Sequence, residues 1–314
     1  MAMSRVLGIV PLVVVLACAT EEPEAPWELQ AMSFANSEWA APVHLPAPVN
    51  SSFRELAARL SPDGLSLYFG SDRTQGSLGG FDIWVSHRAC TGCAWEEPVN
   101  LGPNINSPGA DGSPELSADG HLLFFSGSRD AGQGGEDIWV SRRADVDDDR
   151  GWEPAVNLGP AVNTVASEAG PEYVPALEAG AAGLYFTRGS DVFQVRITRD
   201  GEAAEPAVPV AELNDPTTTD GNVTVRADGR EAFFWSNRLG GMGGADIWVA
   251  TRRSPHDVWS TPENAGPVIN TGSADLTPSL SHDGRTLLFS AGAAARPSLG
   301  LQDIWMTTRN SSGH

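Results

Sequence analysis

The chain has 314 residues and a formal net charge of −20, with 34 glycines and 23 prolines. An acidic chain with no basic stripe does not suit a nucleic-acid backbone, so nucleic acid is excluded as a partner. Short runs of aromatic and β-branched residues between the glycines and prolines predict an all-β protein with many turns.

The N-terminus has the layout of a secretory signal. Residues 1–17 carry one positive charge, Arg5, and then an apolar run that is too short to span a bilayer. Val15–Cys18 is similar to a bacterial lipobox, which implies a lipidated Cys18; ordinary cleavage is the alternative. We therefore expect an exported protein that touches the membrane only through its lipid. Because Ala19 follows the cysteine, we expect the outer membrane, with the protein facing the periplasm or the cell surface.

Residues 18–38 are rich in glutamate and proline and predict an acidic flexible tether. Beyond it, Cys90 and Cys93 lie in the sequence RACTGCAW, between strand signals. In an oxidising compartment we expect them to form a disulfide at the end of a hairpin. A metal site would need two further soft ligands, and a redox-active pair normally opens a helix, so both alternatives are less favoured.

A unit of about 55 residues recurs five times over residues 39–309. Each unit opens with a Trp-x-x-Pro-like segment, followed by an acidic residue, an Asp-Gly turn, an apolar strand, a glycine-rich loop and an Asp-Ile-Trp strand. The second unit shows the full form from Trp95 to Val140, whereas the third is degenerate, with Ala179-Gly180 at its turn. Four strands joined by hairpin signals are typical of a propeller blade.

Three elements of these units resemble a known repeat. Ser-Pro-Asp-Gly at 61–64, Ser-Asp-Arg at 71–73 and Gly-Gly-Glu-Asp-Ile-Trp at 134–139 are similar to PD40, or WD40-like, repeats of the TolB type. The resemblance covers residues 39–309 and implies a β-propeller, a fold that mostly serves as a protein-interaction platform. Residues 310–314 are expected to be a disordered tail.

The order of strand types predicts one closed five-bladed ring. We name the strands of a blade A to D from the axis outward. Trp39–Leu45 is a D-type strand that precedes any A strand, and Asp303–Arg309 is a C-type strand with no D strand after it. The strand numbers match only if the N-terminal strand completes the last blade, which also covers an exposed edge. We expect a single monomeric propeller.

Charged residues recur at one mouth of the predicted channel. An acid begins each A strand, and an arginine follows the B strand in four units. The acids are Glu55, Asp111, Glu168, Asp220 and Asp275, and the arginines are Arg73, Arg129, Arg188 and Arg238. Pairing of each acid with an arginine is the favoured interpretation, and a site for a cation or cationic ligand is the alternative. Because Ala293 stands in place of the fifth arginine, Asp275 is the strongest candidate for ligand contact.

Asp145, Asp147 and Asp149 resemble the start of a calcium loop. The glycine comes one place late, however, and Val156 stands where a glutamate is needed, so a solvated acidic turn is favoured over a metal site. We expect no cofactor.

The predicted function is that of a binding module for an envelope protein, with a small cation or a saccharide as the other possible ligand. Glycoside chemistry needs two carboxyl groups in unlike surroundings, whereas the repeated acids are alike. The sequence also lacks a Gly-x-Ser-x-Gly motif. We therefore predict no catalytic residues. A glycosidase or lyase that uses acidic residues of the channel is the alternative.

Overall fold

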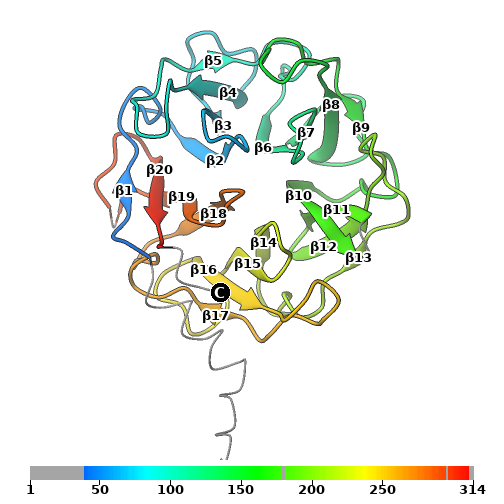
Figure 1. Cartoon of the computed structure of the whole chain (residues 1–314), viewed down its shortest axis with the longest axis vertical. Coiled ribbons are helices and arrows are strands. Elements are labelled where there is room, and N and C mark those ends of the chain that lie inside the picture. Colours follow the sequence, from blue (N-terminus) through cyan, green and yellow to red (C-terminus); the bar gives the residue numbers. More distant parts are fainter. Residues whose placement is uncertain (1–38, 179–180, 295, 311–314) are drawn as a thin grey trace, which may run out of the picture.

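The computed structural model describes residues 39–178, 181–294 and 296–310. These residues form five four-stranded antiparallel sheets around a central axis (Figure 1). The predicted all-β, five-bladed propeller is thereby confirmed. The predicted signal, lipidated Cys18 and tether lie outside the described residues, as do the Ala179-Gly180 turn and the last four residues of the tail. No helix in the described part of the chain is long and apolar enough to cross a membrane.

Blades one to four take their strands in chain order from the axis outward, and blade five takes β1 as its outermost strand. Blade one contains β2 (Glu55–Leu60), β3 (Ser66–Ser71), β4 (Asp82–His87) and β5 (Val99–Asn100). Blade two contains β6 (Asp111–Leu116), β7 (Leu122–Gly127), β8 (Asp137–Arg142) and β9 (Val156–Asn157). Blade three contains β10 (Glu168–Glu178), β11 (Ala181–Arg188), β12 (Asp191–Arg196) and β13 (Val208–Pro209). Blade four contains β14 (Asp220–Val225), β15 (Glu231–Ser236), β16 (Asp246–Thr251) and β17 (Glu263–Asn264). Blade five contains β18 (Asp275–Leu280), β19 (Thr286–Gly292), β20 (Gln302–Thr308) and β1 (Val43–His44).

The ring closes between the two ends of the described chain. β1 pairs antiparallel with β20, with Val43 opposite Met306. In Figure 1 the blue β1 lies beside the red β20. The side chain of Asn50 then binds the backbone of Ile304 on both sides, donating to its carbonyl and accepting from its N–H. The predicted closure by the N-terminal strand is therefore confirmed, and it covers the outer edge of β20.

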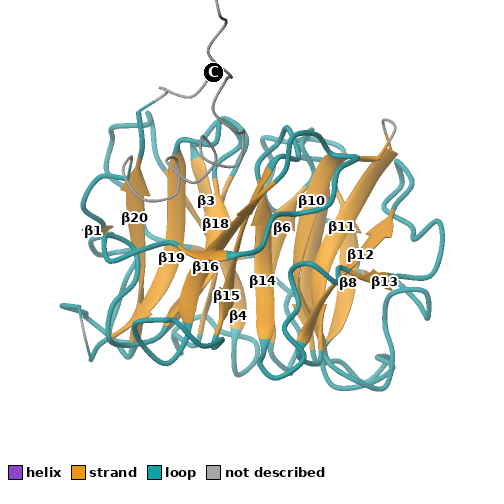
Figure 2. Cartoon of the chain, turned by 90° about the horizontal axis from the view of Figure 1, so that it is seen from below, coloured by secondary structure: helices purple, strands orange, loops and turns teal. Residues whose placement is uncertain are grey.

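The tight A-to-B hairpins follow from the repeated Asp-Gly. In blade one, the N–H of Gly64 donates to the carbonyl of Ser61, and the Asp63 carboxylate accepts the N–H of Leu65. Gly64 has φ 71°, a left-handed conformation that glycine adopts without a steric penalty. Because neighbouring strands are antiparallel, these turns and the C-to-D loops lie on one face of the disc, and the D-to-A and B-to-C loops lie on the other. Figure 2 shows loops at both faces.

Large apolar side chains pack between neighbouring blades. Tyr68 of β3 shares one cluster with Leu123 and Phe125 of β7, and Phe233 of β15 shares another with Phe289 of β19. The tryptophans that recur in the C strands are buried in four such clusters: Trp84, Trp139, Trp248 and Trp305. Truncation of such a ring typically costs about 3–5 kcal/mol. The tryptophans thus hold blades together rather than forming an exposed stacking surface.

Every A strand contains a β-bulge at the same place. The register with the B strand shifts, for example, between Leu56 and Arg59 in blade one and between Gly112 and Glu115 in blade two. One residue in each bulge has positive φ: Ala57, Ser113, Gly170, Asn222 and Thr277. A bulge re-aims the residues that follow it. In this propeller the bulge directs one residue of each A strand toward the axis. That residue lies four positions after the acid that begins the strand.

Candidate functional site

We use the name acid ring for Glu55, Asp111, Glu168, Asp220 and Asp275. Each of these residues is buried at the start of its A strand. In blade one, the Glu55 carboxylate accepts the N–H and hydroxyl of Ser51 at 2.9 and 2.6 Å, and Nη2 of Arg73 at 3.0 Å. In blade two, Asp111 binds Ser107 and Arg129 in the same way. The acid ring therefore fixes each D-to-A loop to its own blade.

The arginines of these pairs also donate to a backbone carbonyl and stack on an aromatic ring. Nη2 of Arg73 donates to the carbonyl of Val49 at 2.7 Å, and its guanidinium lies over the Trp84 ring at 5.3 Å. The structure places the other arginines in the corresponding positions: Arg129, Arg188 and Arg238. The sequence-predicted groups are thus brought together in pairs inside each blade and shielded from solvent.

Asp275 has an arginine partner after all. Arg296 reaches it from the longer B-to-C loop of blade five, with 3.6 Å between Nε and Oδ1, and stacks over Trp305 at 5.0 Å. The expectation that Asp275 lacks this partner is wrong, because the arginine comes three residues later than in the other repeats. Burial raises the pKa of the Asp275 carboxyl, and the distant guanidinium only partly opposes this.

The three aspartates of the predicted acidic turn do not converge. Asp149 forms an ion pair with Arg143, with 2.6 Å between Nη1 and Oδ1, and contacts Tyr68 and His87 of blade one. Asp145 instead accepts the N–H of Asp147. Within the described residues, no three His, Cys, Asp or Glu side chains are grouped so as to hold a metal ion. The turn therefore offers no built calcium site.

A second ring lies deeper in the channel, four residues after each member of the acid ring. We name it the channel ring; it consists of Arg59, Glu115, Glu172, Thr224 and Ser279. Arg59 of blade one contacts Glu115 of blade two through Nε and Glu172 of blade three through Nη2, the latter at 2.6 Å from Oε2. Its Nη1 donates to the Thr224 hydroxyl of blade four at 3.3 Å. Four blades thus meet around one guanidinium.

The two glutamates of the channel ring lie in unlike surroundings. Oε1 of Glu172 accepts the N–H of Val225 at 2.8 Å and the Thr224 hydroxyl at 3.0 Å. Among the described residues, Oε1 of Glu115 accepts only the N–H of Tyr173, at 3.1 Å. Hydrogen bonds to a carboxylate favour its charged form, so Glu172 is the better stabilised anion.

Burial dominates the protonation of this pair. It raises the pKa of Glu115 well above the ordinary range; Arg59 opposes the rise and the nearby Glu172 adds to it. Burial also raises the pKa of Glu172. Arg59 and the hydrogen bonds from Val225 and Thr224 oppose this rise without cancelling it. One guanidinium cannot compensate two buried carboxylates, so the pair titrates as a coupled unit that retains a proton above the usual glutamate range.

The channel ring borders two cavities on the axis. The larger one, of about 50 Å³, opens between the A-to-B turns and is lined by Arg59, Glu115, Glu172, Tyr173 and His282, among other residues. The smaller, of about 20 Å³, lies toward the other face among the bulge residues. Sequence reasoning missed the channel ring. The available signal was charge, because an arginine and two glutamates occupy this position of a buried strand in three of the five units.

No protein-family model and no curated protein matches the chain. Among solved structures, an α-L-arabinofuranosidase from Lactobacillus brevis is 13% identical with a TM-score of 0.58, covering 85% of this chain and 94% of that one. The catalytic domain of the Coprinopsis cinerea GH62 α-L-arabinofuranosidase is 9% identical with a TM-score of 0.57, covering 88% and 98%. A thermostable family-43 glycoside hydrolase is 14% identical with a TM-score of 0.56, covering 84% and 91%. A putative TolB from Agrobacterium tumefaciens has a TM-score of 0.47.

This comparison contradicts the prediction of a binding module that is not an enzyme. The three solved structures above with TM-scores over 0.5 are glycoside hydrolases or arabinofuranosidases, which favours the carbohydrate-active alternative. The prediction was wrong because it considered the acid ring, whose members are alike, and overlooked the unlike pair in the channel ring. At identities of 16% or less, however, the likeness shows the fold alone.

Proposed function

We propose that the chain is a glycoside hydrolase whose reacting groups are Glu115 and Glu172. The observation that carries the proposal is a pair of buried glutamates, with side chains 6% and 4% exposed, that share one arginine at the centre of the channel. Glycosidases pair one carboxyl group of raised pKa with another that stays ionised. The structural neighbours that act on arabinofuranosides are in keeping with this class of reaction.

The surroundings suggest a role for each group. Glu115, with the more strongly raised pKa and the fewer hydrogen bonds, is the proton donor to the departing glycosidic oxygen. Glu172 forms an ion pair with Arg59 and accepts hydrogen bonds from the Thr224 hydroxyl and the N–H of Val225. It is the carboxylate that attacks the anomeric carbon. Arg59 touches both carboxyl groups and holds them at a fixed spacing.

We propose a retaining mechanism for this pair. Nε and Nη2 of one guanidinium contact the two carboxyl groups, and retaining enzymes hold their two carboxyl groups about 5 Å apart. Glu172 then attacks the anomeric carbon while Glu115 protonates the leaving oxygen, which gives a glycosyl ester. Glu115, now ionised, takes a proton from the water that cleaves this ester.

Access to the pair is from the face that carries the A-to-B turns. A cavity of about 50 Å³ has room for water rather than for a whole sugar ring, so the substrate approaches from its mouth. Tyr173 and His282 line this mouth and provide polar groups for sugar hydroxyls. The net charge of −20 disfavours polyanionic substrates, so we propose a neutral saccharide.

The test is hydrolysis of a panel of neutral aryl glycosides and polysaccharides by the purified protein. Glu115→Gln and Glu172→Gln are each expected to lower the rate of the hydrolysed substrate by about 10²- to 10⁴-fold. Glu231→Gln is the matched control, since Glu231 is buried and paired with Arg309 away from the channel. Equal rates in all four proteins, or no hydrolysis of any neutral substrate, would contradict the proposal.

We also infer that the repeats are of the PD40 type and that the protein is exported and anchored through a lipidated Cys18. The repeated Ser-Pro-Asp-Gly and Asp-Ile-Trp elements support the first inference, and the lipobox-like Val15–Cys18 supports the second. Incorporation of labelled palmitate into the protein, but not into a Cys18→Ala variant, is the expected result for the anchor.

A further inference from the structure

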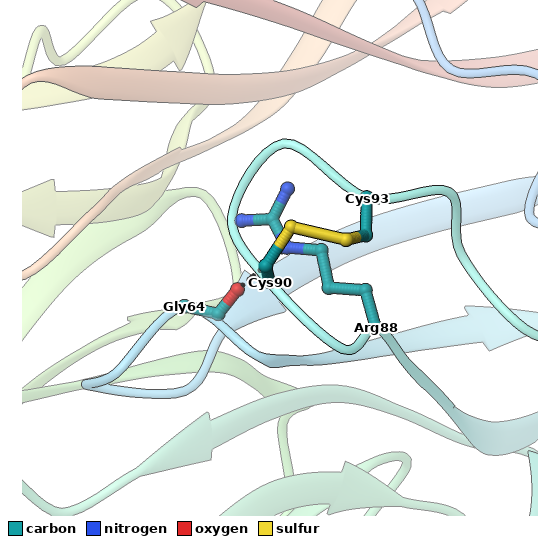
Figure 3. Close-up of a disulfide and its surroundings, with 4 residues drawn as sticks. All are labelled: Gly64, Arg88, Cys90 and Cys93. Carbon is teal, nitrogen blue, oxygen red and sulfur yellow. Dashed lines mark hydrogen bonds between the residues drawn. A yellow bond between two sulfur atoms is a disulfide. The ribbon is translucent and has the colours of Figure 1, made fainter.

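The Cys90–Cys93 disulfide lies in the C-to-D loop of blade one. Its sulfur atoms join residues whose Cα atoms are 5.0 Å apart, and residues 89–94 are all exposed. Figure 3 shows the disulfide in this loop beside Arg88, whose Nε donates to the carbonyl of Gly64 at 2.8 Å. Neither cysteine belongs to a hydrophobic cluster of the propeller.

The same loop forms in blade four without a disulfide. Residues 253–258 have the length of residues 89–94 and lie between an arginine and a tryptophan in the same way. Ser254 and Asp257 occupy the places of the two cysteines. The N–H of Asp257 donates to the carbonyl of Ser254 at 3.1 Å, and the N–H of Cys93 donates to that of Cys90 at 2.9 Å. In blade four the two side chains are joined only by a hydrogen bond of 2.9 Å.

The ends of the two loops are fixed by identical contacts. Arg88 stacks on Trp95 at 4.3 Å, and Arg252 stacks on Trp259 at 4.0 Å. Each arginine also donates through Nε to a carbonyl of the A-to-B hairpin in its own blade. These contacts and the turn therefore define the loop without a covalent link, and the Cys90–Cys93 bond closes too short a segment to restrict the unfolded chain strongly.

From this internal comparison we propose that Cys90–Cys93 is a thiol–disulfide exchange site that opens and closes while the propeller stays folded. A thiolate of an external dithiol forms a bond with one protein sulfur and breaks the Cys90–Cys93 bond, which releases the other protein sulfur as a thiolate. The second thiol of the reductant then displaces the first protein sulfur. The reductant leaves as a disulfide, and its two protons pass to Cys90 and Cys93.

The experiment treats the native protein with dithiothreitol, without denaturant, and then alkylates free thiols. Trypsin places both cysteines in residues 89–129, so mass spectrometry of that peptide reads this pair separately from Cys18. We expect complete alkylation of Cys90 and Cys93, at a rate that low concentrations of urea do not change, because the bond is exposed. We also expect oxidised dithiothreitol to restore the bond.

Cys90→Ser with Cys93→Asp is the matched variant, because it copies the blade-four pair into blade one. Its Tm is expected to lie within about 2 °C of that of the reduced protein, and both within about 5 °C of the oxidised protein. Reduction that occurs only when urea unfolds the protein, or that itself unfolds the propeller, would overturn the proposal. Hydrolysis of glycosides plays no part in these readouts.

Discussion

The acid ring and the channel ring lie on the same five strands, four residues apart, and differ in what each blade contributes. Every member of the acid ring is a carboxylate, bound by its own loop and by an arginine of its own blade. The channel ring contains an arginine, two glutamates, a threonine and a serine, and its contacts run between blades. Residues of one type at the same position in every repeat thus stabilise single blades. Residues that differ between repeats make contacts that require the whole ring.

Breaking one pair of the acid ring should have the largest effect. Arg129→Met leaves the buried Asp111 without its cation, and we expect a loss of about 3–5 kcal/mol in the free energy of unfolding. Urea denaturation at neutral pH measures it. Arg196→Met is the control, because the side chains of Arg196 and its partner Glu205 are 46% and 42% exposed, and its effect should stay below about 1 kcal/mol. Equal losses in the two variants would mean that the acid ring contributes no more than a surface pair.

The channel ring should affect how the free energy of unfolding changes with pH more than its value at any one pH. The pKa of Glu115 is raised in the folded state, so above 4.5, the ordinary value, the folded protein retains a proton that the unfolded chain has lost. The free energy of unfolding therefore falls as the pH rises through this window. Glu115→Gln removes the group, so we expect a smaller fall than in the original protein. Urea denaturation across this pH range checks the difference, and parallel curves for the two proteins would refute it.

The smallest effect should separate two members of the acid ring. Asp111 accepts Nε of Arg129 at 2.9 Å, whereas Nε of Arg296 is 3.6 Å from Asp275. Because Asp111 accepts a charge-assisted hydrogen bond, whereas the 3.6 Å contact of Asp275 is too long for one, Asp275→Asn should cost about 1 kcal/mol less stability than Asp111→Asn. Urea denaturation of the two variants at the same pH provides the measurement. A larger loss for Asp275→Asn would show that the long contact in blade five is not the weaker one.

The parts of the molecule that could be predicted from the sequence are those that repeat. The period of about 55 residues and the unmatched segments at Trp39 and Asp303 were sufficient for five blades and for their closure. The pairing of Asp275 could not be predicted, because the blade-five loop is longer and Arg296 falls out of register with the other arginines. The contacts of Arg59 depend on the bulges, which bring three distant segments to one axis and leave no local sequence signal beyond the charged residues themselves.

The seam between β1 and β20 also bears on how the propeller responds to force. Trp39 forms a β-bridge with Arg309. A force applied through the chain before Trp39 would therefore act first on the seam that closes the ring. Tension from that side acts on a two-residue strand and the Asn50 side chain before it reaches any other blade. Under load, the disc would therefore come apart from blade five, while blades one to four, each made from consecutive segments, would be the last to yield.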